Sequence, residues 1–399
     1  MVSHFARLLG PAHLDFAEDA VQEAMLRALE TWPYQGIPHN GAAWLFRVAH
    51  NVAIDAARRN KLLGDKTESI VAELSRSAAR VPDDPDIEEQ LRDDELRMIF
   101  MCCHPALTRD SSVALGLKTV GGFSVREIAR AFLSDEVAIA QRLTRAKRAL
   151  REDGLTLEMP RGAELTQRLT SVLDVLYFIF NEGYSAHEGE DLIRQDLCFE
   201  ALRLAGLVAS SSIATPRVHA LTALMSFHAA RLPARVDAAG DLILLEDQDR
   251  SRWDRNLINQ GFHLFDRSIT GDEVSEFHVQ SAIAATHARA ADANDIDWPL
   301  ILDLYDQLLA INPSPVVALN RAVALAKVEG AATALVEVDR LAGDPKLSDY
   351  HLLLAVRGHL LTELDRRNEA AASYRAAMQR PCSIPERRFL ERRLAALSP

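Results

Sequence analysis

The sequence predicts an all-α protein. Aromatic residues make up only 6% of the 399 residues, and the chain is rich in Ala and Leu, a balance that favours helices over sheets. Apolar residues also recur at the helical spacing i, i+3, i+4 and i+7 in one segment after another. A chain of this length is too long for a single compact core, so we expect two or three helical domains.

Composition excludes several classes of protein. An apolar fraction of 48% and a charged fraction of 26% are those of a folded globular chain. The longest apolar run, Val175–Phe180, is far shorter than the ~20 residues of a membrane span. The chain does not open on a secretion signal. Four cysteines in so long a chain indicate a reducing compartment, so we expect a cytoplasmic protein without membrane attachment.

Charge is unevenly distributed along the chain. The overall net charge is −12. Residues 1–155 hold 20 Lys and Arg against 23 Asp and Glu, whereas residues 156–399 hold 25 against 34. Five basic residues and no acid lie between Gln141 and Arg151. A local basic face on an acidic chain is compatible with nucleic-acid binding at that face alone.

Two helices are predicted near the N-terminus. The first covers residues 15–31, with Asp15 as N-cap and an apolar face of Val21, Ala24, Met25 and Ala28. Pro33 is expected to end it. The second covers residues 42–60 and has Trp44, Val48, Val52 and Ala56 along one stripe. Its outer face is expected to carry Arg47, His50, Asn51, Asp55 and Arg58.

Residues 62–86 are polar, end in two prolines, and indicate a domain boundary. Helices are then predicted near 91–103 and 109–120. A short helix around 125–132 and a longer one from Glu136 follow, separated by a break at 133–135. The longer helix has Ile139, Leu143, Ala146 and Leu150 on one side and a basic opposite face. The pattern fits a helix-turn-helix; an amphipathic pair with a solvated basic face fits equally well.

The last hundred residues contain a weak repeat. Tyr305, Val338 and Tyr374 are 33 and 36 residues apart, and the small residues Ala322 and Gly358 are similarly separated. A period near 34 residues with small, aromatic and proline positions is typical of tetratricopeptide-type helical hairpins.

Three segments with reactive side chains are better explained by structure than by chemistry. Cys102 and Cys103 lack further ligands for a metal and are expected to end a core helix. The segment 245–253 carries several acids without a nucleophile or histidine partner, so we expect a structural polar network there. Gly183 is expected just after a helix end. No phosphate-binding glycine motif is present, and we expect neither an enzyme nor a metal or cofactor.

Two N-terminal segments resemble a known family. "AEDAVQEAMLRALETWP" followed by "AAWLFRVAHNVAIDAARR" is similar to regions 2.2 and 2.3–2.4 of bacterial extracytoplasmic-function sigma factors. "LTRDSSVALGLKTVGGFSVREIARAFLSDEVAIAQRLTRAKRALR" resembles their region 4. The remainder, with "YFIFNEGYSA" and "NPSPVVALNRAVALA", resembles the tetratricopeptide-like extension of one sigma subgroup. Family members carry a complete region 2.1 helix first, and here only about fourteen residues precede region 2.2.

The resemblance implies a fold and a set of partners. The fold would comprise a sigma region 2 helical domain (1–62), a linker (63–90), a region 4 helix-turn-helix domain (91–153) and a helical extension (160–399). Core RNA polymerase, through the coiled coil of its β′ subunit, and promoter DNA are the implied partners. The loop 34–40 corresponds to the loop that receives a flipped-out base.

The resemblance also assigns residues. It gives polymerase binding to Asp19, Gln22 and Glu23, contact with the −10 element to Asn51, Asp55 and Arg58, and contact with the −35 element to Glu136, Gln141, Arg142, Arg145 and Arg148.

The sequence thus favours an alternative sigma factor whose C-terminal domain regulates it in cis, through a contact between that extension and the sigma regions. One alternative is a helix-turn-helix regulator that binds duplex DNA without polymerase and carries a ligand- or peptide-binding helical domain. In another, the C-terminal part is a small-molecule hydrolase or a binding module.

Overall fold

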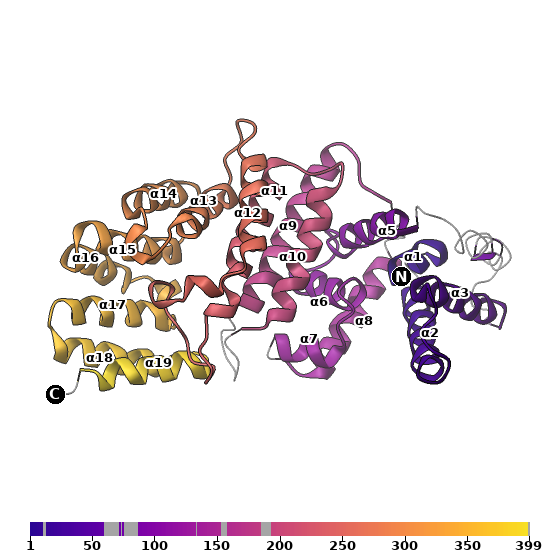
Figure 1. The fold of residues 1–399 in the computed structure, drawn as a ribbon, viewed down its shortest axis with the longest axis horizontal. Coiled ribbons are helices and arrows are strands. Elements are labelled where there is room, and N and C mark those ends of the chain that lie inside the picture. The colour runs from indigo at the N-terminus through magenta and orange to yellow at the C-terminus, as the bar shows by residue number, and fades with distance from the viewer. Residues whose placement is uncertain are drawn as a thin grey trace. The chain divides into compact units, whose positions relative to one another are not determined.

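The computed structural model describes residues 1–10, 13–59, 72, 74–75, 87–132, 134–152, 158–184 and 193–397. The chain divides into two compact units, 1–175 and 176–399, which are described separately. Within the described ranges the secondary structure is helical (Figure 1), apart from one isolated bridge between Val236 and Leu242. The all-α prediction is confirmed. The predicted boundary at 62–86 lies outside the described residues except at three positions.

The first unit is built around a short N-terminal helix. Phe5 of that helix is fully buried, and its ring lies 4.7 Å from the ring of His50 and 5.7 Å from that of Phe46. Asp94 bonds the helix from another side, 2.8 Å from His4 Nδ1 and 2.6 Å from Arg7 Nε. The helices that begin in this unit are α1 (Val2–Leu9), α2 (Leu14–Gln35), α3 (Gly41–Arg59), α5 (Ile87–Cys102), α6 (Arg109–Thr119), α7 (Val125–Ala131), α8 (Glu136–Glu152) and α9 (Ala163–Tyr184), which continues into the second unit.

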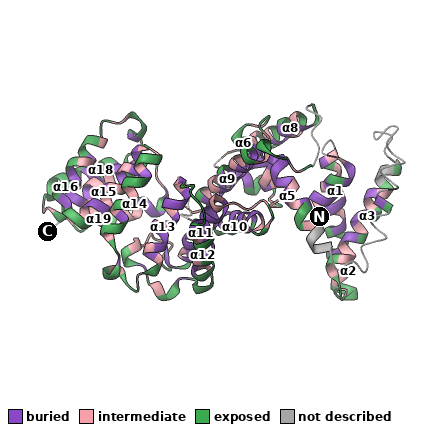
Figure 2. Ribbon diagram, turned by 90° about the horizontal axis from the view of Figure 1, so that it is seen from above, coloured by how far each residue is buried: buried purple, intermediate pink, exposed green. Residues whose placement is uncertain are grey.

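The centre of the second unit is α11, which is buried on almost all sides, as expected of a helix surrounded by others. It packs against α10, α12 and α13. Buried residues lie where neighbouring helices face each other, and exposed residues lie along their outer edges (Figure 2). These helices are α10 (Gln195–Ser210), α11 (Pro216–Ala230), α12 (Arg255–Ser268) and α13 (Glu276–Arg289).

The rest of the second unit is a row of helices in which each packs against the next. Val338 and Tyr374, two of the repeat positions, are buried here. Gly358 lies against the Tyr374 ring so closely that a Cβ there would come within 2.7 Å of it, which explains the small residue. These helices are α14 (Trp298–Ile311), α15 (Pro315–Glu329), α16 (Ala331–Leu341), α17 (His351–Glu363), α18 (Arg367–Met378) and α19 (Ile384–Ala395).

Two structural expectations are confirmed and one is wrong. Cys102 and Cys103 are buried at the end of α5, and burial raises the pKa of the Cys102 thiol to about 12. In the segment 245–253, Arg250 donates hydrogen bonds to two backbone carbonyls and stacks on buried Trp253. Gly183 does not follow a helix end. It lies inside the last turn of α9, where a Cβ would collide with the backbone of the next helix at 2.8 Å.

Candidate functional site

The outer face of α3 presents the first set of candidate residues. Asn51, Asp55 and Arg58 are exposed and follow one another at i, i+4 and i+7, so they share one side of the helix. The opposite side is fixed by the packing of α1. A row of polar side chains on a helix held rigidly from behind can contact a partner without first being ordered.

The buried face of α3 differs from the predicted stripe. Phe46, Ala49, His50 and Ala53 are buried, whereas Trp44 is only half-buried. The prediction that His50 lies on the outer face is wrong, because Phe5 from α1 packs on its ring. His50 Nδ1 lies 3.1 Å from the Phe46 carbonyl oxygen, and burial lowers the pKa of His50 to about 4.

The connection between α2 and α3 begins later than predicted. Pro33 lies inside α2 and does not end it, so Tyr34 is helical. The helix ends at Gln35 and is followed by the capping residue Gly36, whose φ of 83° suits glycine. Asn40 caps the next helix by accepting a hydrogen bond from the Ala43 amide at 2.9 Å. Beside it the rings of Trp32 and Trp44 lie 5.5 Å apart.

The outer face of α2 combines acidic and apolar side chains. Asp19 and Gln22 are exposed, and half-buried Glu23 pairs with Arg27 at 2.9 Å. Met25, expected in the core, is 49% exposed. Met25, Leu26 and Leu29 form an exposed apolar stripe, and Leu29 is 72% exposed. Exposed apolar stripes of this kind mark binding surfaces. The sequence already contains this signal, because α2 has more apolar residues than a single buried face can hold.

The pair α7 and α8 presents the second set. Ser124 and Glu127 form a capping box at the start of α7, and Asp135 accepts a hydrogen bond from the Ala138 amide at 2.7 Å at the start of α8. The predicted inner stripe of α8 is buried, as expected. Leu133, in the predicted break, lies outside the described residues. These caps hold the first turns of α7 and α8 in place, so the two helices can present a rigid surface to a partner.

A shallow surface groove runs between these two helices. It is lined in part by Glu136, Gln141 and Arg145, and also by Val137 and Thr144. Sequence reasoning missed the last two, although Val137 is 65% exposed. The remaining predicted residues lie elsewhere on α8: Arg142 is half-buried with Nη2 3.6 Å from Asp110, and exposed Arg148 pairs with Glu152 at 3.5 Å.

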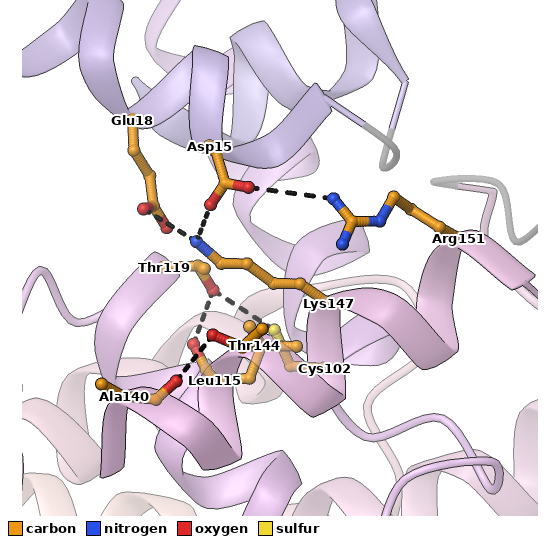
Figure 3. A network of polar contacts seen from close by, with 9 residues as sticks. All are labelled: Asp15, Glu18, Cys102, Leu115, Thr119, Ala140, Thr144, Lys147 and Arg151. Atoms are coloured by element: carbon orange, nitrogen blue, oxygen red, sulfur yellow. Dashed lines mark hydrogen bonds and ion pairs between the residues drawn. The ribbon is translucent and has the colours of Figure 1, made fainter. Parts of the chain in front are cut away.

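An ion-pair cluster joins α2 to α8 (Figure 3). Lys147 Nζ donates to Asp15 Oδ1 at 2.6 Å and to Glu18 Oε2 at 3.0 Å. Asp15, expected as an N-cap, lies in the first turn and makes this bond instead, while His13 occupies the N-cap position. Arg151 lies 3.9 Å from the other Asp15 oxygen. Nothing in the local sequence distinguishes Lys147 from the basic residues around it.

Burial sets the electrostatics of this cluster. It raises the pKa of the Glu18 carboxyl above its ordinary value, and the charge of Lys147 only partly offsets it. Burial also acts to lower the pKa of Lys147, but its hydrogen bond to Asp15 and the charge of Glu18 outweigh burial and raise it. Lys147 is therefore firmly cationic. The Glu18 oxygen Oε1 has no hydrogen-bond partner within the described part of the chain.

Two further observations bear on the kind of protein. Across the residues described above, no group of three or more His, Cys, Asp or Glu side chains could hold a metal ion. None of the described helices is both long and apolar enough to cross a membrane.

Two segments of the chain match known protein families. Residues 1–62 match the Sigma-70 region 2 family, and residues 168–269 match a family of unknown function, DUF6596. An uncharacterized protein of Rhizobium meliloti (strain 1021) is 40% identical over 387 residues, which are 97% of this chain and 91% of that protein. No solved structure matches the chain significantly. The chain belongs to one family with the Rhizobium protein along nearly its whole length, and the match of residues 1–62 to Sigma-70 region 2 supports a sigma factor role in transcription initiation.

Proposed function

We propose that the protein is an alternative sigma factor of the extracytoplasmic-function type. The observation that carries the proposal is the region 2 match over residues 1–62, which contains the exposed α3 face. Asn51, Asp55 and Arg58 on that face contact the −10 element of the promoter. Amide, carboxylate and guanidinium groups are the side chains that recognise base edges, and the buried back of α3 keeps them in register.

The −35 element is contacted by α8 as the second helix of a helix-turn-helix. Exposed Gln141 suits adenine edges, and exposed Arg145 suits guanine edges or phosphates. Glu136 and Gln141 line the same groove as Arg145. Arg142 and Arg148, which pair with Asp110 and Glu152 in the free protein, contact phosphates once these pairs open.

Core polymerase binds the outer face of α2, through the coiled coil of its β′ subunit. Asp19, Gln22 and Glu23 supply the polar contacts. The neighbouring apolar stripe at Met25, Leu26 and Leu29 supplies buried area, which acidic side chains alone cannot provide. An acidic and apolar face of this kind is complementary to a surface of mixed basic and apolar character.

A binding comparison separates this function from that of a polymerase-independent regulator. The protein should be captured by purified core polymerase, and it should bind promoter DNA specifically only as part of that complex. If the free protein binds a defined duplex sequence and core polymerase does not capture it, the sigma proposal fails.

The C-terminal helical part, which we interpret as tetratricopeptide-like, regulates the sigma activity in cis. It spans residues 160–399, more than promoter recognition requires, and residues 156–399 carry the larger excess of acid. Tethering gives it a high effective concentration near the basic α8 helix, so a weak contact suffices. The full chain should be compared in transcription with chains ending near Asp153 and at Val175, with saturating core. Equal activity of all three would remove the regulatory role.

A further inference from the structure

The second unit contains a cavity of about 370 Å³ that the proposed sigma function does not use. Helices α14, α15, α17 and α19 and the segment 242–246 line it. Its walls are mainly apolar, with Trp298, Val323, Ala355 and Phe389 among them. This volume lies within the range of small-molecule sites, about 300–1,000 Å³.

One wall of the cavity contains a buried polar atom without a partner. His287 lines the cavity and is 9% exposed, and its Nδ1 has no hydrogen-bond partner within the described residues. Burial, with the charges of Arg231 and Arg250, lowers the pKa of His287 to about 3, so its ring is neutral at ordinary pH. A buried polar atom without a partner costs free energy, and a ligand group would supply the missing hydrogen bond.

The charged side chains of the cavity do not all pair with one another. Lys327 Nζ lies 2.7 Å from Glu246, and His359 Nε2 lies 3.3 Å from Glu363. Both of these carboxylates therefore have partners, and the third carboxylate of the lining, Glu386, accepts hydrogen bonds from the Ser383 amide at 2.9 Å and the Ser383 hydroxyl at 2.7 Å. Arg393 lies over the Phe389 ring at 5.2 Å, and within the described part of the chain no carboxylate lies at ion-pair distance from it.

We propose that this cavity binds a small amphipathic carboxylic acid. The apolar tail occupies the space between α15, α17 and α19, and the carboxylate pairs with Arg393, which has no ion-pair partner among the described residues. An arginine beside a carboxylate forms strong, charge-assisted hydrogen bonds. The mainly apolar wall selects against short polar acids, because these would gain little from burial.

Calorimetric titration of the full chain with decanoate tests the site. Decanoate should bind saturably, with one site per chain. Decanol, which lacks the charge, and acetate, which lacks the tail, should each bind at least about tenfold more weakly. Arg393→Gln should weaken decanoate binding about tenfold or more, because it removes the charge-assisted hydrogen bonds to the carboxylate.

Two further variants locate the binding. Ala355→Trp places a large ring in the cavity and should abolish decanoate binding. Arg387→Gln removes an exposed arginine of the same helix that does not line the cavity and should leave it unchanged. Absence of saturable binding to the wild type, equal binding of decanol, or full binding by the Arg393 or Ala355 variant would overturn the proposal. The titration contains neither polymerase nor DNA, so its failure leaves the sigma proposal untouched.

Discussion

At the scale of single residues, Lys147 has the most specific environment in the first unit. It is one of five basic residues between Gln141 and Arg151, and its side chain is only 12% exposed. Its partner Glu18 is equally buried. Sequence periodicity places Lys147 at the edge of the apolar stripe, one turn after Leu143, but only the packing of α2 against this point shows that it is buried. Long-range contacts of this kind are not encoded in local spacing.

Removing the Lys147 charge should therefore destabilise the fold. Lys147→Met leaves Glu18 as a buried carboxylate without a cation, at a cost of about 1–3 kcal/mol. Urea unfolding should show this loss, and Glu18→Gln in the same chain should restore most of it. Arg148→Met, which removes a neighbouring exposed pair, should cost less than about 0.5 kcal/mol. Equal stability of the two methionine variants would contradict the role assigned to Lys147.

His50 should make stability depend on pH. Its pKa is about 4 in the folded chain and about 6.5 when unfolded. Between these values the unfolded chain binds a proton that the folded chain does not, so stability falls as the pH drops from 6.5 towards 4. His50→Gln should reduce that fall by roughly 1–3 kcal/mol, measured by urea unfolding at pH 7 and at pH 4. An unchanged pH dependence would show that His50 is not buried in neutral form.

At the scale of helices, the sequence predicted where each helix lies along the chain better than which of its sides is buried. The expected helix over 42–60 is α3 (Gly41–Arg59), and the inner stripe of α8 is as predicted. The buried side of α3 is rotated because α1 packs against His50. Pro33 did not act as a stop signal: α2 continues for two residues beyond it, although proline has no backbone N–H to bond the Leu29 carbonyl. The positions of the helices thus follow from the local sequence, whereas the side of a helix that is buried depends on the helices that pack against it.

The α8 helix carries a prediction about DNA. Arg145→Ala should cost about 1–3 kcal/mol at a −35 site if Arg145 recognises a base. Affinities of the holoenzyme for the cognate and a −35-substituted promoter, measured over a range of salt, give the answer. A uniform loss with a shallower salt dependence would make Arg145 a phosphate contact. No change in either quantity would leave α8 as an ordinary amphipathic helix.

The α2 helix carries a prediction about polymerase. Asp19→Lys with Glu23→Lys should weaken binding of core polymerase while leaving the fold intact, because these side chains lie outside the core. Leu29→Asp should weaken it further by disrupting the apolar stripe. The matched control is Asp303→Lys, a charge reversal at an exposed position of α14. Wild-type affinity of the double variant would refute the assignment of this face.

At the scale of the whole molecule, the sequence predicted the fold class and the sigma-like N-terminal part. It did not predict the cavity of the second unit. The cavity is lined by residues from many separate segments between Leu242 and Arg393, and no motif links them. Repeat positions such as Val338 and Tyr374 could be recognised in the sequence, because the packing of each helix on the next repeats along the chain. The absence of an ion-pair partner for Arg393 could not, because it depends on side chains that are distant in the sequence.

The most direct test of the sigma function is transcription by purified core polymerase from templates with randomised upstream sequence. With the protein added, sequencing of the transcribed templates should reveal two shared elements near −35 and −10, and core alone should yield neither. Asn51→Ala with Asp55→Ala should alter or abolish the −10 preference while leaving the −35 element in place. Transcription no higher than with core alone, or transcribed templates without a shared −10 element, would contradict the account.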